Sequence, residues 1–392
     1  MQIRLVGGKH AIFFAARHDL INTITGKYMR RVVAQIMNEH EPQPEFQPQE
    51  SAWGCTVTGI ADTDLSQRMA NSVGAVMQAV LADGYNLSSL EATTISANYT
   101  TSLAELDRGS ELLGVLVPTE EFGVGMAMAA PVMRDGKVMA RLMLDAGIVL
   151  ALMSVDEEQK MFRLCTVVHE LSHIHDLANK DAALPGTFLK PYPGAVLEAE
   201  MFNLSSLAWD EFLATKMSSY LQPTSLEAFD EVLDGALNEL LARLTEARRS
   251  FFTHRDFGRT KREMFGAMQV LLKFSAYVLG SLDGLGRGDE YGPKSRERLL
   301  ASRFAPVFDT LRTALREMAS TYPDWESLQA YAPLRAVAQK ALEVEGFFLS
   351  VAPNEQLWMR IMEPDDFTPE QRIAARFGLR VPERHRVPMS HA

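Results

Sequence analysis

The sequence predicts a protein of the α+β class, in which a small mixed region of strands and helices precedes a mostly helical C-terminal region. Two observations predict this class. Between residue 54 and about residue 153, the hydrophobic pattern alternates between the helical period and the strand period. After residue 200, the pattern is almost wholly helical. The chain has 392 residues, too many for one compact core, so we expect more than one domain.

Three regions follow from the composition along the chain. We expect an N-terminal segment and linker over residues 1–53, a mixed core over 54–222 and a helical domain over 223–392. The first region ends in NEHEPQPEFQPQESAW, and its proline, glutamine and glutamate are typical of a linker because they offer little to pack.

The mixed core contains a series of short elements. The periodicity predicts a helix over 64–84, a strand over 91–100, a short helix over 102–109, a hairpin over 122–144 and a strand over 147–153. Asp135 and Gly136 form the hairpin turn, since both residue types tolerate the positive φ that a tight reversal needs. Ser154 and Glu157 have the spacing of a capping box, which predicts a helix from about Asp156 to Asn179.

The helical region begins with the stretch from Thr224 to Phe252. Thr224 and Glu227 again have capping-box spacing, and the leucines of this stretch recur at helical intervals. Further helices are expected near 260–282, 295–320 and 325–350. The loop GLGRGDEYGP at 284–293 follows a helix and lacks the Lys-Ser/Thr of a P-loop, so we expect a helix connection there and not a phosphate site.

Charge and cysteine content limit the class of function. The chain has 39 basic and 50 acidic residues, a net charge of -11, and no dense basic stripe, which argues against nucleic acid as a partner. Its two cysteines, Cys55 and Cys165, form no disulfide framework and suit a reducing compartment. The apolar runs near the N-terminus and at 146–153 are too short to span a bilayer. We therefore expect a cytoplasmic protein with no membrane partner.

The expected helix over 156–179 contains His169-Glu170-Leu171-Ser172-His173, an HExxH pattern. His169 and His173 lie one turn apart on one face, so their imidazoles can converge on one zinc ion. Glu170 points about 100° away, where it can serve as a general base without being a ligand. The opposite face of the helix is apolar, through Leu164, Val167, Val168, Leu171 and Ile174. The pattern therefore predicts a zinc site of about one ion per chain.

Ordinary interpretations of the same residues remain open. The helix can be a surface helix with incidental histidines, or its zinc can be structural. His175 lies on the apolar face and is interpreted as a packed residue, and Cys165 as a small buried side chain in preference to a ligand. Asp176 follows His173 on the motif face, where it is either a plain surface aspartate or an acceptor that orients a ligand imidazole.

The hairpin, the run GIVLALM, the acidic helix start and VVHELSH together resemble the active-site core of gluzincin metallopeptidases, over roughly residues 90–220. The resemblance implies a zincin-like core and a glutamate as third zinc ligand on a later helix. In WDEFLATKMSSYL, Glu211 and Ala214 match the E-x-x-A arrangement of that helix. The family often has Asp or Asn where this chain has Thr215, so Thr215, Asp176 or Asp210 must orient the ligand.

The third ligand is open between Glu211 and the pair Glu198 and Glu200. Glu211 lies in mid-helix, and the small and apolar residues on its side permit close packing. Glu198 and Glu200 lie near the helix start, where acids are common because they complement the helix dipole. We therefore predict His169, His173 and Glu211 as ligands of Zn²⁺.

The resemblance implies a zinc-dependent peptidase that acts on a protein or peptide substrate, with Glu170 as the general base. It also implies a cleft with the zinc ion at its floor and a donor that stabilises the oxyanion. Tyr220 and His254 are candidates for that donor because they follow the ligand helix. The alternative is a metal-stabilised regulatory or binding protein built on an inactive metallopeptidase core. The sequence leaves the oligomeric state open.

Overall fold

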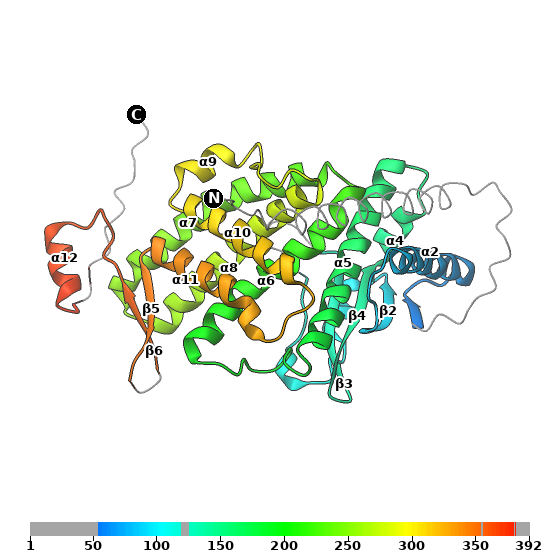
Figure 1. Cartoon of the computed structure of the whole chain (residues 1–392), viewed down its shortest axis with the longest axis horizontal. Coiled ribbons are helices and arrows are strands. Elements are labelled where there is room, and N and C mark those ends of the chain that lie inside the picture. The colour runs from blue at the N-terminus through cyan, green and yellow to red at the C-terminus, as the bar shows by residue number, and fades with distance from the viewer. Residues whose placement is uncertain (1–53, 119–124, 354–355, 380, 382–392) are drawn as a thin grey trace, which may run out of the picture. The chain divides into compact units, whose positions relative to one another are not determined.

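The structure is a computed structural model, and it describes residues 54–118, 125–353, 356–379 and 381. The expected linker over residues 1–53 and the histidines of the C-terminal tail lie outside the described residues. The chain divides into two compact units. The first consists of Met1–Ala182 with Tyr220–Gln222, and the second of Ala183–Ser219 with Pro223–Ala392. The predicted α+β class is confirmed, with a small mixed sheet in the first unit and a mostly helical second unit (Figure 1).

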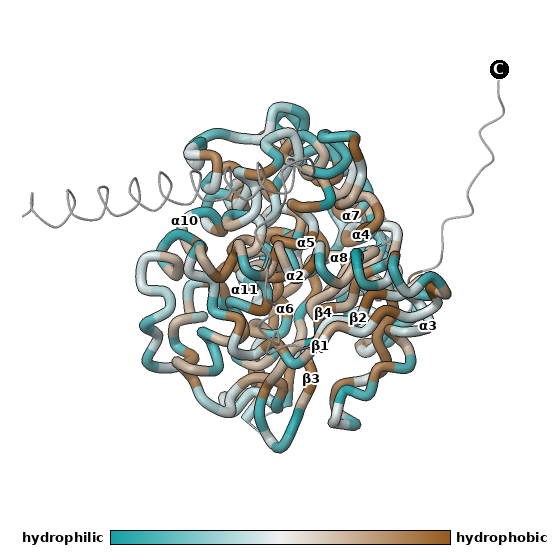
Figure 2. Tube along the Cα trace, turned by 90° about the vertical axis from the view of Figure 1, so that its right-hand side faces the viewer, coloured by the Kyte–Doolittle hydropathy of each residue, from teal (hydrophilic) through white to brown (hydrophobic). Residues whose placement is uncertain are grey.

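The first unit is built on a four-stranded sheet with the order β1-β2-β4-β3. β1 and β4 are parallel to β2, whereas β3 is antiparallel to β4 and forms an edge of the sheet. The hydrophobic residues of β4 appear in brown in Figure 2. The elements are β1 (Gly54–Thr58), α2 (Thr63–Ala82), β2 (Leu90–Ser96), α3 (Tyr99–Ala104), the 3-10 helix η1 (Glu111–Leu113), β3 (Ala127–Arg134), β4 (Lys137–Asp145), α4 (Ala146–Leu152) and α5 (Glu157–Ala183).

The predicted hairpin is confirmed as β3 and β4. Asp135 and Gly136 have φ angles of 48° and 76°, and the ladder closes on the pair Arg134 and Lys137. Positive φ at both central residues is the geometry of a type I′ turn, whose twist matches that of the two strands. The predicted helix over 64–84 is likewise found as α2.

The strand expected over 147–153 is wrong, because this run forms the helix α4. Asp145 ends β4, and its carboxylate accepts a hydrogen bond of 2.7 Å from the amide of Gly147, which caps the helix. A short apolar run fits a buried helix as well as a buried strand, and the periodicity does not separate the two. In the same way β2 ends at Ser96, and α3 begins at Tyr99, earlier than expected.

The start of α5 differs in detail from the expected capping box. Asp156 is the capping residue, since its carboxylate accepts a hydrogen bond of 3.1 Å from the amide of Gln159. Ser154 instead accepts a hydrogen bond from the amide of Asp156, which lies two residues after it. The helix runs from Glu157 to Ala183, so it contains the whole predicted motif.

The second unit is mostly helical, and α8 packs against both α6 and α7. Thr224 precedes α7 but makes no capping bond with its side chain, so the second expected capping box is also absent. The expected helix over 295–320 is two helices, and the one over 325–350 ends in a strand. The elements are α6 (Val196–Ser218), the 3-10 helix η2 (Ser219–Leu221, shared with the first unit), α7 (Ser225–His254), α8 (Phe257–Gly284), α9 (Arg296–Ala301), α10 (Ala305–Thr321), the 3-10 helix η3 (Leu328–Tyr331), α11 (Ala332–Val344), the hairpin β5 (Phe347–Val351) and β6 (Leu357–Ile361), and α12 (Pro369–Arg376).

One described helix, α8, is long and apolar enough to cross a membrane, but 61% of its most apolar window is buried inside the fold. Residues such as Leu271, Leu272 and Val278 have no exposed surface. Core helices of this kind pass the same length and composition test as membrane spans. The burial therefore gives α8 a structural role between its neighbours in the second unit.

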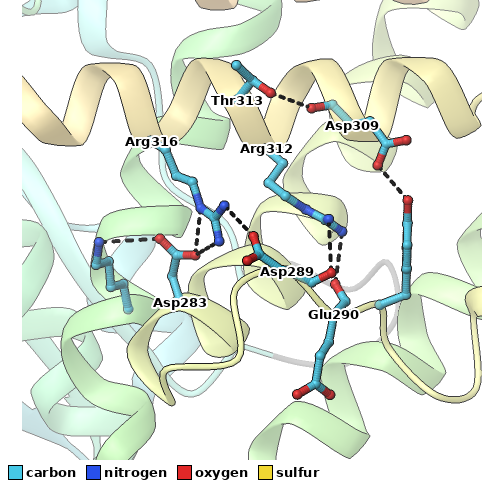
Figure 3. A network of polar contacts seen from close by, with 9 residues as sticks. Asp283, Asp289, Glu290, Asp309, Arg312, Thr313 and Arg316 are labelled. Carbon is cyan, nitrogen blue, oxygen red and sulfur yellow. Dashed lines mark hydrogen bonds and ion pairs between the residues drawn. The ribbon is translucent and has the colours of Figure 1, made fainter.

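The segment from Leu285 to Ser295 connects α8 to α9, as expected, and polar contacts hold it on α10 (Figure 3). The Arg316 guanidinium donates to Asp283 at 3.0 and 3.1 Å and to Asp289 at 2.8 Å. Arg312 donates to the carbonyl oxygen of Glu290 at 2.9 Å. The segment follows a helix and is held by these side-chain contacts, so it is a connection between two helices and not a phosphate-binding loop.

Candidate metal centre

The helix α5 has an apolar back and a polar front, as its sequence predicts. Five residues of the back are at most 4% exposed: Leu164, Val167, Val168, Leu171 and Ile174. Because these side chains fill the core of the first unit, His169, Glu170 and His173 are left on a half-buried face. The burial of the back thus fixes the direction in which the motif points.

The two motif histidines face each other across one turn of α5. Their Nε2 atoms lie 3.2 Å apart, and the rings are nearly perpendicular at 87°. Two imidazole nitrogens bound to one tetrahedral zinc ion, each at 2.0 to 2.1 Å, would lie about 3.3 Å apart. The spacing in the helix therefore fits two ligands of one ion.

Glu211 is the third member of the group. Among the described residues, His169, His173 and Glu211 form a group in which one potential ligand atom from each lies within 4.8 Å of the others. Glu211 is 5% exposed, and Lys273 on α8 lies 3.6 Å from its carboxylate. This group can hold a metal ion, and two imidazoles with one carboxylate are a donor set that zinc accepts.

The competing glutamates on α6 have other neighbours. Glu200 forms an ion pair with Lys261 on α8. Glu198 lies beside Gly194, close enough that a Cβ added to that glycine would be 2.5 Å from the Glu198 carboxylate. Among the described residues, neither belongs to the group that could hold a metal ion with the two histidines.

Glu170 is anchored on the edge strand of the sheet. Its Oε2 accepts a hydrogen bond of 2.7 Å from the backbone amide of Ala129 in β3. Only one carboxylate oxygen is used in this bond, and the side chain is half-buried. The sheet thus fixes the orientation of the predicted general base, next to His169 in sequence.

Tyr99 is a further residue close enough to Glu170 for the two to interact electrostatically, and sequence reasoning did not identify it. Its side chain is 6% exposed in a cluster with Leu103, Ala130 and Met143. Burial raises the pKa of its hydroxyl, and the negative charges of Glu170 and Asp145 raise it further. Within the described part of the chain this hydroxyl has no hydrogen-bond partner. In the sequence, Tyr99 falls inside the strand expected over 91–100, and an aromatic residue in a strand is too common to indicate a site.

His175 is a packed residue, as its place on the apolar face predicts. Its Nδ1 accepts a hydrogen bond of 2.8 Å from the amide of Asn86, and its ring contacts that of Tyr85. Burial lowers the pKa of His175 to about 4. The bond to Asn86 also requires an unprotonated nitrogen, so His175 remains neutral and structural.

Asp176 and Cys165 flank the motif on α5. Asp176 is 1% exposed and forms an ion pair of 2.8 Å with Lys180, so it is not a plain surface aspartate. Cys165 is half-buried and does not belong to the metal-binding group. Thr215, the expected neighbour of Glu211, is buried one turn after it, and its hydroxyl has no hydrogen-bond partner among the described residues.

The two expected oxyanion donors have different surroundings. His254 ends α7, where its Nδ1 accepts a hydrogen bond of 2.8 Å from the amide of Asp256, a role in the helix terminus. Tyr220 lies in the first unit, and burial is the main cause that raises its pKa, with contributions from the charges of Tyr85, Asp83 and Cys165. His254 therefore has a local structural role, and Tyr220 belongs to a buried polar cluster.

Asp83, in that cluster, gives a pH-dependent prediction. Both carboxylate oxygens are buried without a described hydrogen-bond partner, and burial raises its pKa from 3.8 to about 6. Because the folded pKa is above the unfolded value, ionisation of Asp83 destabilises the folded state. The contribution of this carboxyl group to the free energy of unfolding is fully present below about pH 4 and is lost as the pH rises through about 6.

We therefore expect Asp83→Asn to stabilise the protein by about 1 kcal/mol near pH 8, after allowance for solvent screening, and to have little effect near pH 4. Urea unfolding of both proteins at the two pH values measures the difference. Equal changes at the two pH values, or a loss of stability at the higher one, would contradict a desolvated carboxylate.

Comparison of the chain with protein-family models, with curated proteins and with solved structures finds no match.

Proposed function

We propose that this protein is a zinc-dependent peptidase with a zincin-like core. The observation that carries the proposal is the group of His169, His173 and Glu211, whose ligand atoms lie within 4.8 Å of one another. It gains support from Glu170, which follows the first ligand and is held by the backbone of β3. Two histidines one turn apart, a carboxylate ligand and an adjacent carboxylate that is not a ligand are the parts that zinc-assisted hydrolysis needs.

The residues present fit zinc better than a harder cation. Mg²⁺ and Ca²⁺ prefer sites made of oxygen ligands, whereas two of these three donors are imidazole nitrogens. Three protein ligands leave a fourth position for water or substrate, which is the arrangement of a catalytic site. Lys273, at 3.6 Å from the Glu211 carboxylate, is outside normal hydrogen-bond distance.

Zinc bound by these residues would supply Lewis acidity, which lowers the pKa of a coordinated water and polarises a peptide carbonyl. Glu170 then accepts the proton of the attacking water and delivers it to the leaving amine. The hydrogen bond from Ala129 holds one oxygen of this carboxylate, so the other oxygen is available for the proton.

Removal of the metal tests this function. We expect a chelator to abolish cleavage of an unfolded, fluorescently labelled protein, and added zinc to restore it. Circular dichroism of the same samples distinguishes the two candidate functions. A peptidase keeps its fold and recovers activity with zinc, whereas a metal-stabilised binding protein loses structure on chelation and shows no cleavage in either state. The second result, or cleavage that persists without metal, would contradict the proposal.

A further inference from the structure

A cavity of about 360 Å³ lies in the second unit, and charged side chains from several elements line it. The volume is in the range of small-molecule sites. α7 contributes four residues, the connection between α9 and α10 two, and the segments after α11 and β6 the remainder. The charged residues of the lining are Arg248, Arg249, Arg303, Glu345, Asp365 and Asp366.

Arg248 is the unusual member of this lining. Its side chain is only 8% exposed, and its one described ion contact, to Asp365, is long at 3.9 Å. Its Nε is buried and has no hydrogen-bond partner among the described residues. A buried guanidinium normally has several partners, because an unpaired buried charge is costly. Arg248 therefore lines the cavity with a guanidinium for which the described residues supply one long ion contact and no partner at Nε.

The neighbouring carboxylates are engaged by other arginines. Arg303 lies 2.8 Å from Asp365, and Arg249 lies 2.8 Å from Asp366. These short contacts use two of the three acids in the lining, and they leave Arg248 with only its long contact. Arg248 thus has no short ion contact among the described residues, although the charges of Asp365 and Glu345 also act on it.

Glu345 is the third acid, and it is 8% exposed. Burial raises the pKa of this carboxyl, although the positive charges of Arg303 and Arg248 oppose the shift. The next residue, Gly346, has a φ of 86°, and a Cβ added there would be 2.8 Å from Nη1 of Arg248. The absence of a side chain at this position allows the guanidinium to lie against the backbone.

We propose that this cavity binds a small organic oxyanion, a molecule with a phosphate or carboxylate group, through the guanidinium of Arg248. Both groups accept two parallel hydrogen bonds from a guanidinium, the strongest arrangement available to that side chain. Leu241 and Pro364 offer an apolar wall for the organic part of the ligand. The anionic group of such a ligand would pair with the Arg248 guanidinium, which has one long ion contact among the described residues.

Calorimetric titration of the full chain tests the proposal, and the Arg248→Met variant separates binding in this cavity from binding at the histidine group. The probes are phenyl phosphate and benzoate, compared at constant ionic strength. We expect saturable binding of at least one probe, and the tighter of the two identifies the headgroup. Arg248→Met retains the length of the stem, and it should weaken binding at least about tenfold. Arg243→Met is the control, because Arg243 is also on α7, is 48% exposed and is absent from the lining.

Glu345→Gln keeps the test decisive if the Arg248 variant fails to fold. Removal of this negative charge should tighten probe binding several-fold, because the carboxylate shares the cavity with the anion. Absence of binding to both probes in the unmodified chain overturns the proposal. Equal binding by the folded Arg248→Met variant, or weaker binding by Glu345→Gln, also overturns it.

Discussion

Glu170→Gln is expected to retain the metal and the fold but to lower the rate of peptide hydrolysis by about 10²- to 10⁴-fold, the usual contribution of a general base. The amide is nearly isosteric with the carboxylate, and its oxygen can still accept the hydrogen bond from Ala129. It cannot take a proton from water near neutral pH. The variant therefore removes the proton acceptor and leaves its position on the sheet unchanged.

The measurement is the rate of cleavage of an unfolded protein, with metal content and thermal stability determined on the same preparation. Glu158→Gln is a matched control, since Glu158 is an exposed glutamate in the first turn of the same helix. The control should cleave at the unmodified rate. Near-normal cleavage by Glu170→Gln, shown to be its own, would contradict the role proposed for this carboxylate.

Glu211→Ala is expected to weaken zinc binding by at least about 100-fold. Loss of a partner that only orients a ligand costs 10- to 100-fold in metal affinity, and loss of the ligand itself should cost no less. The same change leaves Lys273 beside an empty space, where its side chain is only 17% exposed. A buried charge without its partner is destabilising, so the thermal midpoint should also fall.

Glu198→Ala and Glu200→Ala are the matched controls, because both residues lie on the same helix and outside the metal-binding group. Competition titration with a zinc chelator compares the affinities of all three variants. Both controls should bind zinc as the unmodified chain does. If Glu211→Ala binds as tightly as the unmodified chain while either control does not, the assignment of the third ligand is wrong.

Local chemistry made part of the fold predictable. The Asp135-Gly136 turn needs no distant partner, because its positive φ angles follow from the two residue types. The apolar back of α5 was equally readable, since one face repeats every three or four residues. The strand expected over 147–153 is wrong because a short apolar run fits a buried strand and a buried helix equally well. In the structure, the carboxylate of Asp145 caps the helix that this run forms.

The candidate site was predictable to the extent that it lies on one helix. The spacing of His169 and His173 fixes their convergence, whereas the choice of Glu211 depended on a resemblance and on helical phase. Tyr99 and the anchor of Glu170 on Ala129 depend on the packing of the sheet, which no local pattern encodes. The cavity around Arg248 combines residues that are as distant in the sequence as 241 and 366. Its charge distribution depends on the ion pairs that Arg249 and Arg303 form with Asp366 and Asp365, and no local pattern predicts these pairs.

Metal analysis of the purified chain is the most direct test of the central claim, that His169, His173 and Glu211 hold a zinc ion. The protein is expressed with zinc in the medium, freed of any polyhistidine tag and compared with His169→Ala and His173→Ala by mass spectrometry of the metal. We expect about one zinc ion per unmodified chain and a large loss of zinc in each variant. Stoichiometric zinc in both variants, or none in the unmodified chain, would contradict it.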